Sequence, residues 1–278
     1  MTMANRTDEV QDGNVVSGRR QFVKAALSVT AGLLMPHESF AQESHSLPGP
    51  PAATNVVLVH GAFADGSSWS GVIPLLEAKG LNVTAVQIPL TSLEEDVATT
   101  RRILAQQTEP TVLVGHSYAG FVITEAGNAP NVVGLVYVSS YGPAAGESHD
   151  DLVKRFPAPS GISAIRLDSD GFLWISRDRF HEAFVADIAA SRARILAAVQ
   201  QPAAKKCFGT PISVAAWTSK PSSFLVSTND HLINPELQRF MAKRMGATTV
   251  SVPSSHASLI SHPVEVANLI AAAAGHQA

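Results

Sequence analysis

Three side chains of complementary chemistry follow predicted strands in this sequence. Ser117 follows TVLVGH, Asp230 follows SFLVSTN, and His256 follows TTVSVPSS. A neutral hydroxyl is a weak nucleophile, so an imidazole must accept its proton, and a carboxylate must hold that imidazole in the correct tautomer and stabilise its charged form. Together the three residue types indicate a nucleophilic serine that attacks a carbonyl carbon.

The serine stands in a glycine-flanked turn between Gly115 and Gly120. The Val and Leu residues of 111–116 are typical of a strand buried on both faces, and residues 121–126 have the pattern of a starting helix. This arrangement resembles the nucleophile elbow of the α/β-hydrolase fold, where small neighbours leave room for a sharp bend. Ala119 stands where the strict G-x-S-x-G pattern has its second glycine, and its small side chain still meets the steric requirement.

The acid and the base are selected by their positions after strands. Beyond the serine, Asp230 is the only carboxylate directly after a well-defined predicted strand, and His256 is the only histidine just past the last one. The resemblance implies the order serine, acid, histidine, which these residues follow. Glu236 remains an alternative acid, although we expect it on the following helix. The other histidines flank the nucleophile or the acid, begin a helix, or lie beneath the loop after the first strand (His116, His231, His262 and His60).

The elements that must position these groups alternate between strands and helices. Predicted strands cover 55–60, 82–88, 111–116, 132–139, 223–227 and 248–252. Predicted helices cover 69–79, a segment from 93 to 104 with a capping box of Ser92 and Glu95, a segment from Pro235 to Met245, and a last helix from Pro263. This alternation predicts an α/β fold with a mostly parallel, doubly wound sheet, whose ligands bind beyond the carboxyl ends of the strands.

The alternation stops between about residues 144 and 212, where aromatic side chains accumulate and residues 178–201 have helical spacing. In the α/β-hydrolase resemblance this segment is an inserted helical lid over the strand ends. Its aromatic residues either line the substrate pocket or fasten the lid to the core. We expect Trp174 of the lid and Phe63 of the loop after the first strand to line the pocket.

The resemblance extends from about residue 55 to 273 and carries further residues. VLVHGAFADGSSW, VGHSYAG, TNDHLINPELQRFMA and SSHASL resemble the branch that contains plant methyl-ester esterases and hydroxynitrile lyases. It implies an oxyanion hole formed by the backbone amides of Ala62 and Tyr118. The lyases carry a threonine and a lysine where this chain has Gly61 and Ala257. Without that lysine no cation stabilises departing cyanide, so ester hydrolysis is favoured.

Composition limits the classes of partner. The chain has 278 residues, of which 45% are hydrophobic and 15% charged, enough to bury a substantial core. Its formal charge is -3 and basic residues do not cluster beyond residue 24, so nucleic acid is not an expected partner. The single Cys207 excludes an intrachain disulfide and a cysteine-based metal cluster, and neither H-E-x-x-H nor a Walker glycine pattern occurs. We therefore expect a small-molecule ester substrate, no metal and no cofactor.

The N-terminus is typical of a processing segment. Arg19 and Arg20 precede the apolar stretch 25–35, which is too short to cross a bilayer but matches an export signal. The arginine pair resembles the bacterial twin-arginine signal, with cleavage after Ala41. We predict a signal peptide over 1–41, a linker over 42–53 and an α/β-hydrolase domain over 54–276. The expected location is periplasmic or secreted, reached through transient contact with the twin-arginine export machinery and without a stable membrane anchor after the signal is removed.

The sequence therefore predicts a serine hydrolase that cleaves carboxylic esters of small molecules through an acyl-enzyme. Hydroxynitrile lyase or perhydrolase chemistry on the same scaffold is one alternative. A small-molecule receptor with a hydrolase fold is another, since some receptors of this fold retain the three residues.

Overall fold

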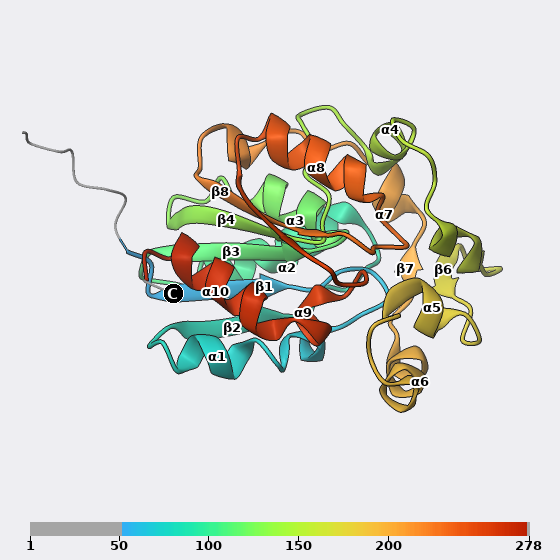
Figure 1. Cartoon of the computed structure of the whole chain (residues 1–278). Coiled ribbons are helices and arrows are strands. Elements are labelled where there is room, and N and C mark those ends of the chain that lie inside the picture. Colours follow the sequence, from blue (N-terminus) through green and yellow to red (C-terminus); the bar gives the residue numbers. More distant parts are fainter. Residues whose placement is uncertain (1–51, 277–278) are drawn as a thin grey trace, which may run out of the picture. The chain divides into compact units, whose positions relative to one another are not determined.

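The computed structural model describes residues 52–276, and at its centre lies a six-stranded sheet whose neighbouring strands are all parallel (Figure 1). Across the sheet the strands are β2 (Asn82–Val86), β1 (Asn55–Val59), β3 (Thr111–His116), β4 (Val132–Val138), β8 (Ser222–Ser227) and β9 (Thr248–Val252). The predicted α/β fold class with a doubly wound parallel sheet is confirmed.

The position of each strand in the sheet follows from its composition. Every residue of β1 and β3 is buried, as expected for continuous apolar runs covered on both faces. The edge strands β2 and β9 are more polar and leave residues such as Asn82 and Thr248 exposed. The serine turn therefore follows a strand from the middle of the sheet.

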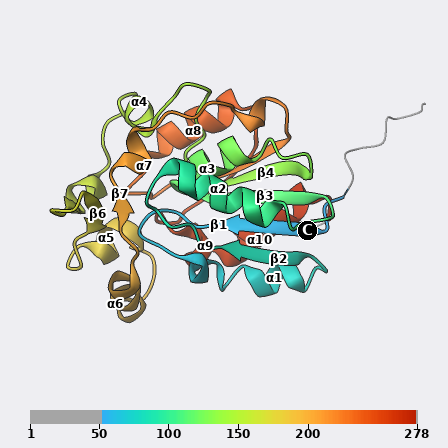
Figure 2. The same cartoon turned by 180° about the vertical axis from the view of Figure 1, so that it is seen from behind.

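Helices cover both faces of the sheet. They are α1 (Ile73–Glu77), α2 (Leu93–Leu104), α3 (Ala119–Ala126), α8 (Pro235–Arg244), α9 (Ser258–Ser261) and α10 (Pro263–Ala273), with short 3-10 segments η1 (Gly66–Trp69) and η3 (Ala216–Thr218). Helices α1 and α10 lie together on one face, and α2 and α3 on the other (Figures 1 and 2). This layering is the one that a doubly wound sheet requires.

Two predicted helix starts differ from the structure in detail. The predicted helix 69–79 is divided into η1, whose Asp65 cap accepts a hydrogen bond from Ser67 N–H, and α1, which carries Pro74 in its first turn. At α2, Ser92 Oγ accepts from Glu95 N–H at 3.2 Å, which is half of the capping box. The Glu95 carboxylate accepts instead from the Thr91 hydroxyl.

The lid, residues 144–212, lies beyond the carboxyl ends of the strands and contains the predicted helices together with a small sheet (Figure 1). Its elements are α4 (His149–Val153), η2 (Ser160–Ala164), β5 (Ile165–Leu167), β6 (Phe172–Ile175), α5 (Phe180–Phe184), α6 (Ala190–Val199), β7 (Ala203–Ala204) and α7 (Lys206–Gly209). The antiparallel sheet β5-β6-β7 was not predicted, because strands of three, four and two residues are too short to show a clear alternation.

The predicted signal peptide 1–41 and residues 42–51 of the predicted linker lie outside the described residues. Within residues 52–276, no helix has the length and apolar character needed to span a bilayer.

Candidate active site

Ser117 occupies a strained turn between β3 and α3. Its φ of 55° lies in the left-handed region that residues with a side chain rarely adopt. A Cβ on Gly115 would lie 2.9 Å from the Ala119 carbonyl oxygen, and one on Gly120 would lie 1.9 Å from the Tyr141 carbonyl oxygen. Glycine is therefore required at 115 for α3 to follow β3 this closely, and at 120 for the segment after β4 to pack against α3. The turn presents the Ser117 hydroxyl at the strand end.

The structure brings Ser117, His256 and Asp230 into one hydrogen-bonded relay. His256 Nε2 lies 2.8 Å from Ser117 Oγ, and His256 Nδ1 lies 2.8 Å from Asp230 Oδ2. All three residues are buried. Because an ionised carboxylate can only accept, Nδ1 carries the proton and Nε2 is left to accept from the Ser117 hydroxyl. This is the proton arrangement that a serine nucleophile needs before it attacks.

The Asp230 carboxylate is held by donors from its own loop and from α8. Its Oδ1 accepts from the N–H groups of Leu232 and Ile233 at 2.7 and 3.0 Å. Its Oδ2 accepts from Gln238 Nε2 at 2.8 Å, in addition to His256. Gln238 is fully buried, and its Oε1 accepts from Ser227 N–H at 3.0 Å.

Sequence reasoning missed Gln238. The available signal was its place on the apolar side of α8, next to Leu237 and near Met241, where a polar side chain needs a buried partner. The alternative acid, Glu236, is not part of this relay. It is exposed and pairs with Arg239 on the surface of α8.

The remaining histidines make other contacts. His60 Nδ1–H donates to the Gly61 carbonyl at 2.9 Å while its Nε2 accepts from Ile88 N–H at 3.1 Å, and burial lowers its pKa. His116 Nε2–H donates to the His256 carbonyl at 3.1 Å, and burial lowers the pKa of His116 well below its ordinary value. His231 donates to the Glu182 carbonyl, and His262 lies 3.8 Å from Asp187. Among the described histidines, His256 is the one that reaches the Ser117 hydroxyl.

The backbone amides of Ala62 and Tyr118 flank the serine and are both buried. In the part of the chain that the structure describes, neither N–H donates to another protein atom. Buried N–H groups are almost always paired, so two of them beside a nucleophile are suited to an oxygen of a ligand. A Cβ on Gly61 would lie 2.7 Å from Ser117 Cβ, so the threonine found in the lyases has no room here without a shift.

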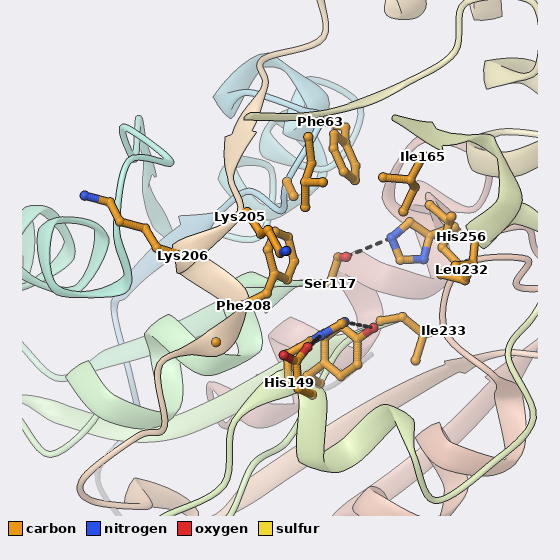
Figure 3. A pocket seen from close by; sticks show the side chains of 16 residues that line it. Phe63, Ser117, His149, Ile165, Lys205, Lys206, Phe208, Leu232, Ile233 and His256 are labelled. Carbon is orange, nitrogen blue, oxygen red and sulfur yellow. Dashed lines mark hydrogen bonds and ion pairs between the residues drawn. The ribbon is translucent and has the colours of Figure 1, made fainter. Parts of the chain in front are cut away.

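A cavity of about 500 Å³ opens beside Ser117 and His256, as Figure 3 shows. Most of its wall is apolar. Lining side chains come from the loop after β1, the lid and the Asp230 loop (among them Phe63, Ile162, Ile165, Leu173, Phe208 and Leu232). Ligand sites of about 300–1,000 Å³ suit small molecules.

Of the two residues predicted to line the pocket, the structure places one in the cavity wall and one outside it. Phe63 lines the cavity, whereas Trp174 does not. Trp174 is 37% exposed, and its Nε1–H donates to Asp168 Oδ2 at 2.8 Å on the outside of the lid. Since neighbouring side chains of a strand point to opposite faces, Leu173 of β6 lines the cavity in its place.

The sequence of residues 56–269 matches the model of a protein family described as "Alpha/beta hydrolase family". This chain belongs to that family. The fold and the family predicted from the serine turn are thereby confirmed.

Similar proteins include a named hydrolase and a named methylesterase. A pyrethroid hydrolase of Sphingobium wenxiniae is 27% identical over 78% of this chain and 86% of its own. Methylesterase 8 of Arabidopsis thaliana is 25% identical over 66% of this chain and 75% of its own. A crystal structure of a pyrethroid hydrolase superposes with a TM-score of 0.70 at 26% identity, covering 80% of this chain and 98% of that chain.

A crystal structure of polyneuridine aldehyde esterase superposes with a TM-score of 0.67 at 18% identity, covering 78% of this chain and 98% of that chain. At that identity the likeness shows a shared fold.

Proposed function

We propose that this protein is a serine hydrolase that cleaves carboxylic esters of small, largely apolar molecules, with Ser117, His256 and Asp230 as its catalytic triad. The observation that carries the proposal is the continuous relay from Asp230 through His256 to Ser117, which opens into an apolar cavity. The name of the methylesterase agrees with ester substrates, and that of the pyrethroid hydrolase agrees with hydrolysis.

The reaction follows from the positions of the protons. Ser117 Oγ attacks the ester carbonyl carbon while His256 Nε2 takes its proton, and Asp230 accepts from Nδ1–H and stabilises the imidazolium. The oxyanion that forms accepts hydrogen bonds from the amides of Ala62 and Tyr118. When the tetrahedral intermediate collapses, the alcohol leaves with the proton of His256. Water then attacks the acyl-enzyme through the same base and releases the carboxylic acid.

Ester hydrolysis is favoured over the lyase alternative by two positions. The lysine that lyases carry after the histidine is replaced by Ala257, which is buried, so no cation stands beside His256 at that position. The glycine at 61 packs against the serine without space for a threonine side chain. Both differences remove groups that cyanohydrin cleavage uses in the lyases.

The proposal is tested by Ser117→Ala with p-nitrophenyl butyrate as substrate. We expect kcat/KM to fall by about 10⁴ or more, because the nucleophile is lost. Labelling by a fluorophosphonate should disappear with it. Ser191→Ala, an exposed serine of α6, is the matched control and should keep wild-type activity and labelling. Near wild-type turnover by the Ser117 variant would refute the proposal.

A further inference from the structure

Besides the serine relay, the cavity wall carries a second network of hydrogen-bonded polar groups, formed by Tyr141, His149 and Asp150. Figure 3 shows His149 and Ser117 on the wall of the same cavity. Tyr141 and His149 also line an adjoining cavity of about 140 Å³, whose other walls include Phe156 and Leu237. The two polar side chains thus stand where the two apolar spaces meet.

The positions of the protons in this polar network follow from its hydrogen-bond acceptors. His149 Nδ1 lies 3.2 Å from Asp150 Oδ1, and Nε2 lies 3.1 Å from the Tyr141 hydroxyl. A carboxylate accepts only, so Nδ1 carries the proton. Burial lowers the pKa of His149 although Asp150 opposes it, so the ring is neutral near pH 7 and Nε2 accepts from the Tyr141 O–H.

This leaves the Tyr141 oxygen with unused lone pairs. Across residues 52–276, no other protein group donates a hydrogen bond to this oxygen. Tyr141 is buried, and burial together with the nearby Asp230 raises the pKa of its hydroxyl, so the phenol stays protonated and cannot serve as a nucleophile. Its chemistry in this cavity is that of a hydrogen-bond acceptor.

Packing fixes both side chains relative to the nucleophile. The His149 ring lies edge to face between Tyr141 and Phe208, with centroid distances of 5.0 Å to each. Tyr141 N–H donates to the Ser117 carbonyl at 3.2 Å, and the capping box of Ser148 places His149 at the first position of α4. A polar group held at a constant place in an apolar pocket is the usual means by which a site selects one ligand orientation.

We propose that Tyr141 and His149 form a polar subsite that accepts a hydrogen bond from a hydroxyl or amide N–H of the ester bound at Ser117. The inference rests on the proposed ester hydrolysis and deepens it by naming a feature of the substrate. An ester with only apolar atoms at this place leaves the Tyr141 lone pairs desolvated and unpaired. An ester with a donor there makes the hydrogen bond to Tyr141 that is lost when the ester displaces water. The subsite therefore favours this ester over an otherwise equal ester without the donor.

The test compares p-nitrophenyl alkanoates of increasing chain length with their ω-hydroxy counterparts, because the varied length finds the distance from Ser117 to the subsite. In a purely apolar cavity the added hydroxyl lowers kcat/KM. We expect the hydroxy ester to be preferred by at least about 10-fold at one chain length. Tyr141→Phe combined with His149→Leu, which removes both acceptors, should reduce the preference to one or below. Leu173→Val shortens an apolar side chain of the same cavity wall without removing a polar group or the aromatic ring that packs on His149, and it should keep the preference.

The outcomes separate this inference from the proposed function. If wild type hydrolyses the plain esters through Ser117 but never prefers a hydroxy ester, the subsite is refuted and the hydrolase proposal stands. If the preference survives when Tyr141→Phe and His149→Leu are combined, the subsite is refuted as well. If no ester is turned over, the hydrolase proposal fails, and calorimetric binding of the same ester pairs to Ser117→Ala still tests the subsite. A Kd ratio near one there would overturn it.

Discussion

Gln238 connects the candidate triad to the rest of the core. Its amide donates to Asp230 Oδ2 and to the Ile233 carbonyl, and its own oxygen accepts from Ser227 N–H at the end of β8. The acid therefore has the same orientation relative to the sheet whenever α8 is docked. Because Gln238 acts through Asp230, we regard it as a positioning residue.

We predict that Gln238→Leu lowers kcat/KM for p-nitrophenyl butyrate by about 10–100-fold, because Asp230 and Ser227 N–H each lose a buried partner. The loss should fall mainly on kcat, with KM changed by less than about threefold, because Gln238 positions the acid and does not touch the substrate. Separate measurement of kcat and KM checks both effects. A loss shared equally between kcat and KM would indicate a purely structural role.

Glu236 offers the matched control on the same helix. Glu236→Gln removes an exposed carboxylate whose ion pair, within residues 52–276, is with Arg239, so we expect wild-type kcat and KM. Asp230→Asn should lower kcat/KM by up to about 10⁴, as in other triads. If the two variants exchanged these effects, Glu236 rather than Asp230 would be the acid.

Helix α2 connects Tyr118, beside the nucleophile, to the lid through one buried carboxylate. Asp96 accepts from Leu90 N–H at 2.8 Å and from the Tyr118 hydroxyl at 2.9 Å. The Leu90 carbonyl in turn accepts from Ala204 N–H of β7 at 2.8 Å. Burial outweighs the two hydrogen bonds and raises the pKa of Asp96 from 3.8 to about 6.

We predict that this carboxylate makes the protein less stable as pH rises. The folded state holds the Asp96 proton more tightly than the unfolded chain, so the associated stability is present below about pH 4 and is lost through about pH 6. Asp96→Asn keeps an acceptor for Leu90 N–H without a buried charge. At pH 7.5 it should raise the free energy of unfolding by up to about 3 kcal/mol, with little change near pH 4.

Urea unfolding of wild type and variant at both pH values measures this difference. Glu94→Gln, an exposed neighbour on α2, is the control and should show no such pH dependence. A variant that is less stable than wild type by the same amount at both pH values would contradict the prediction. In that case the hydrogen bonds, rather than the burial of charge, would dominate at Asp96.

The elements differ in how much of them the sequence specifies. The runs of Val and Leu in β1, β3 and β4 identify central strands, because only a strand covered on both faces is apolar throughout. Ser117, Asp230 and His256 could be found because each follows a predicted strand, in the order that the family resemblance implies. Gln238 and Trp174 could not be placed, since the direction of a side chain depends on the packing of α8 and on the face of a four-residue strand.

At the scale of the whole molecule, the parallel sheet explains how distant residues form one site. All six strands are parallel, so the loops after β1, β3, β8 and β9 all lie at the carboxyl end of the sheet. These loops supply Ala62, Ser117, Asp230 and His256 in turn. The lid is inserted after β4, at the same carboxyl end, and supplies further walls of the cavity. Substitutions in the lid can therefore change substrate preference while the reacting groups keep their positions.

We propose further that the full chain reaches the periplasm through the twin-arginine route, which carries proteins that have already folded. A domain that folds before transport needs no disulfide from an oxidising compartment, and the one cysteine of this chain, Cys207, is buried and unpaired. In a bacterial host we expect esterase activity in the periplasmic fraction. It should move to the cytoplasmic fraction when Arg19 and Arg20 are both changed to lysine, because the export machinery distinguishes the two cations. A host that lacks the twin-arginine translocase is the control. Periplasmic activity in that host would show that another route carries the protein.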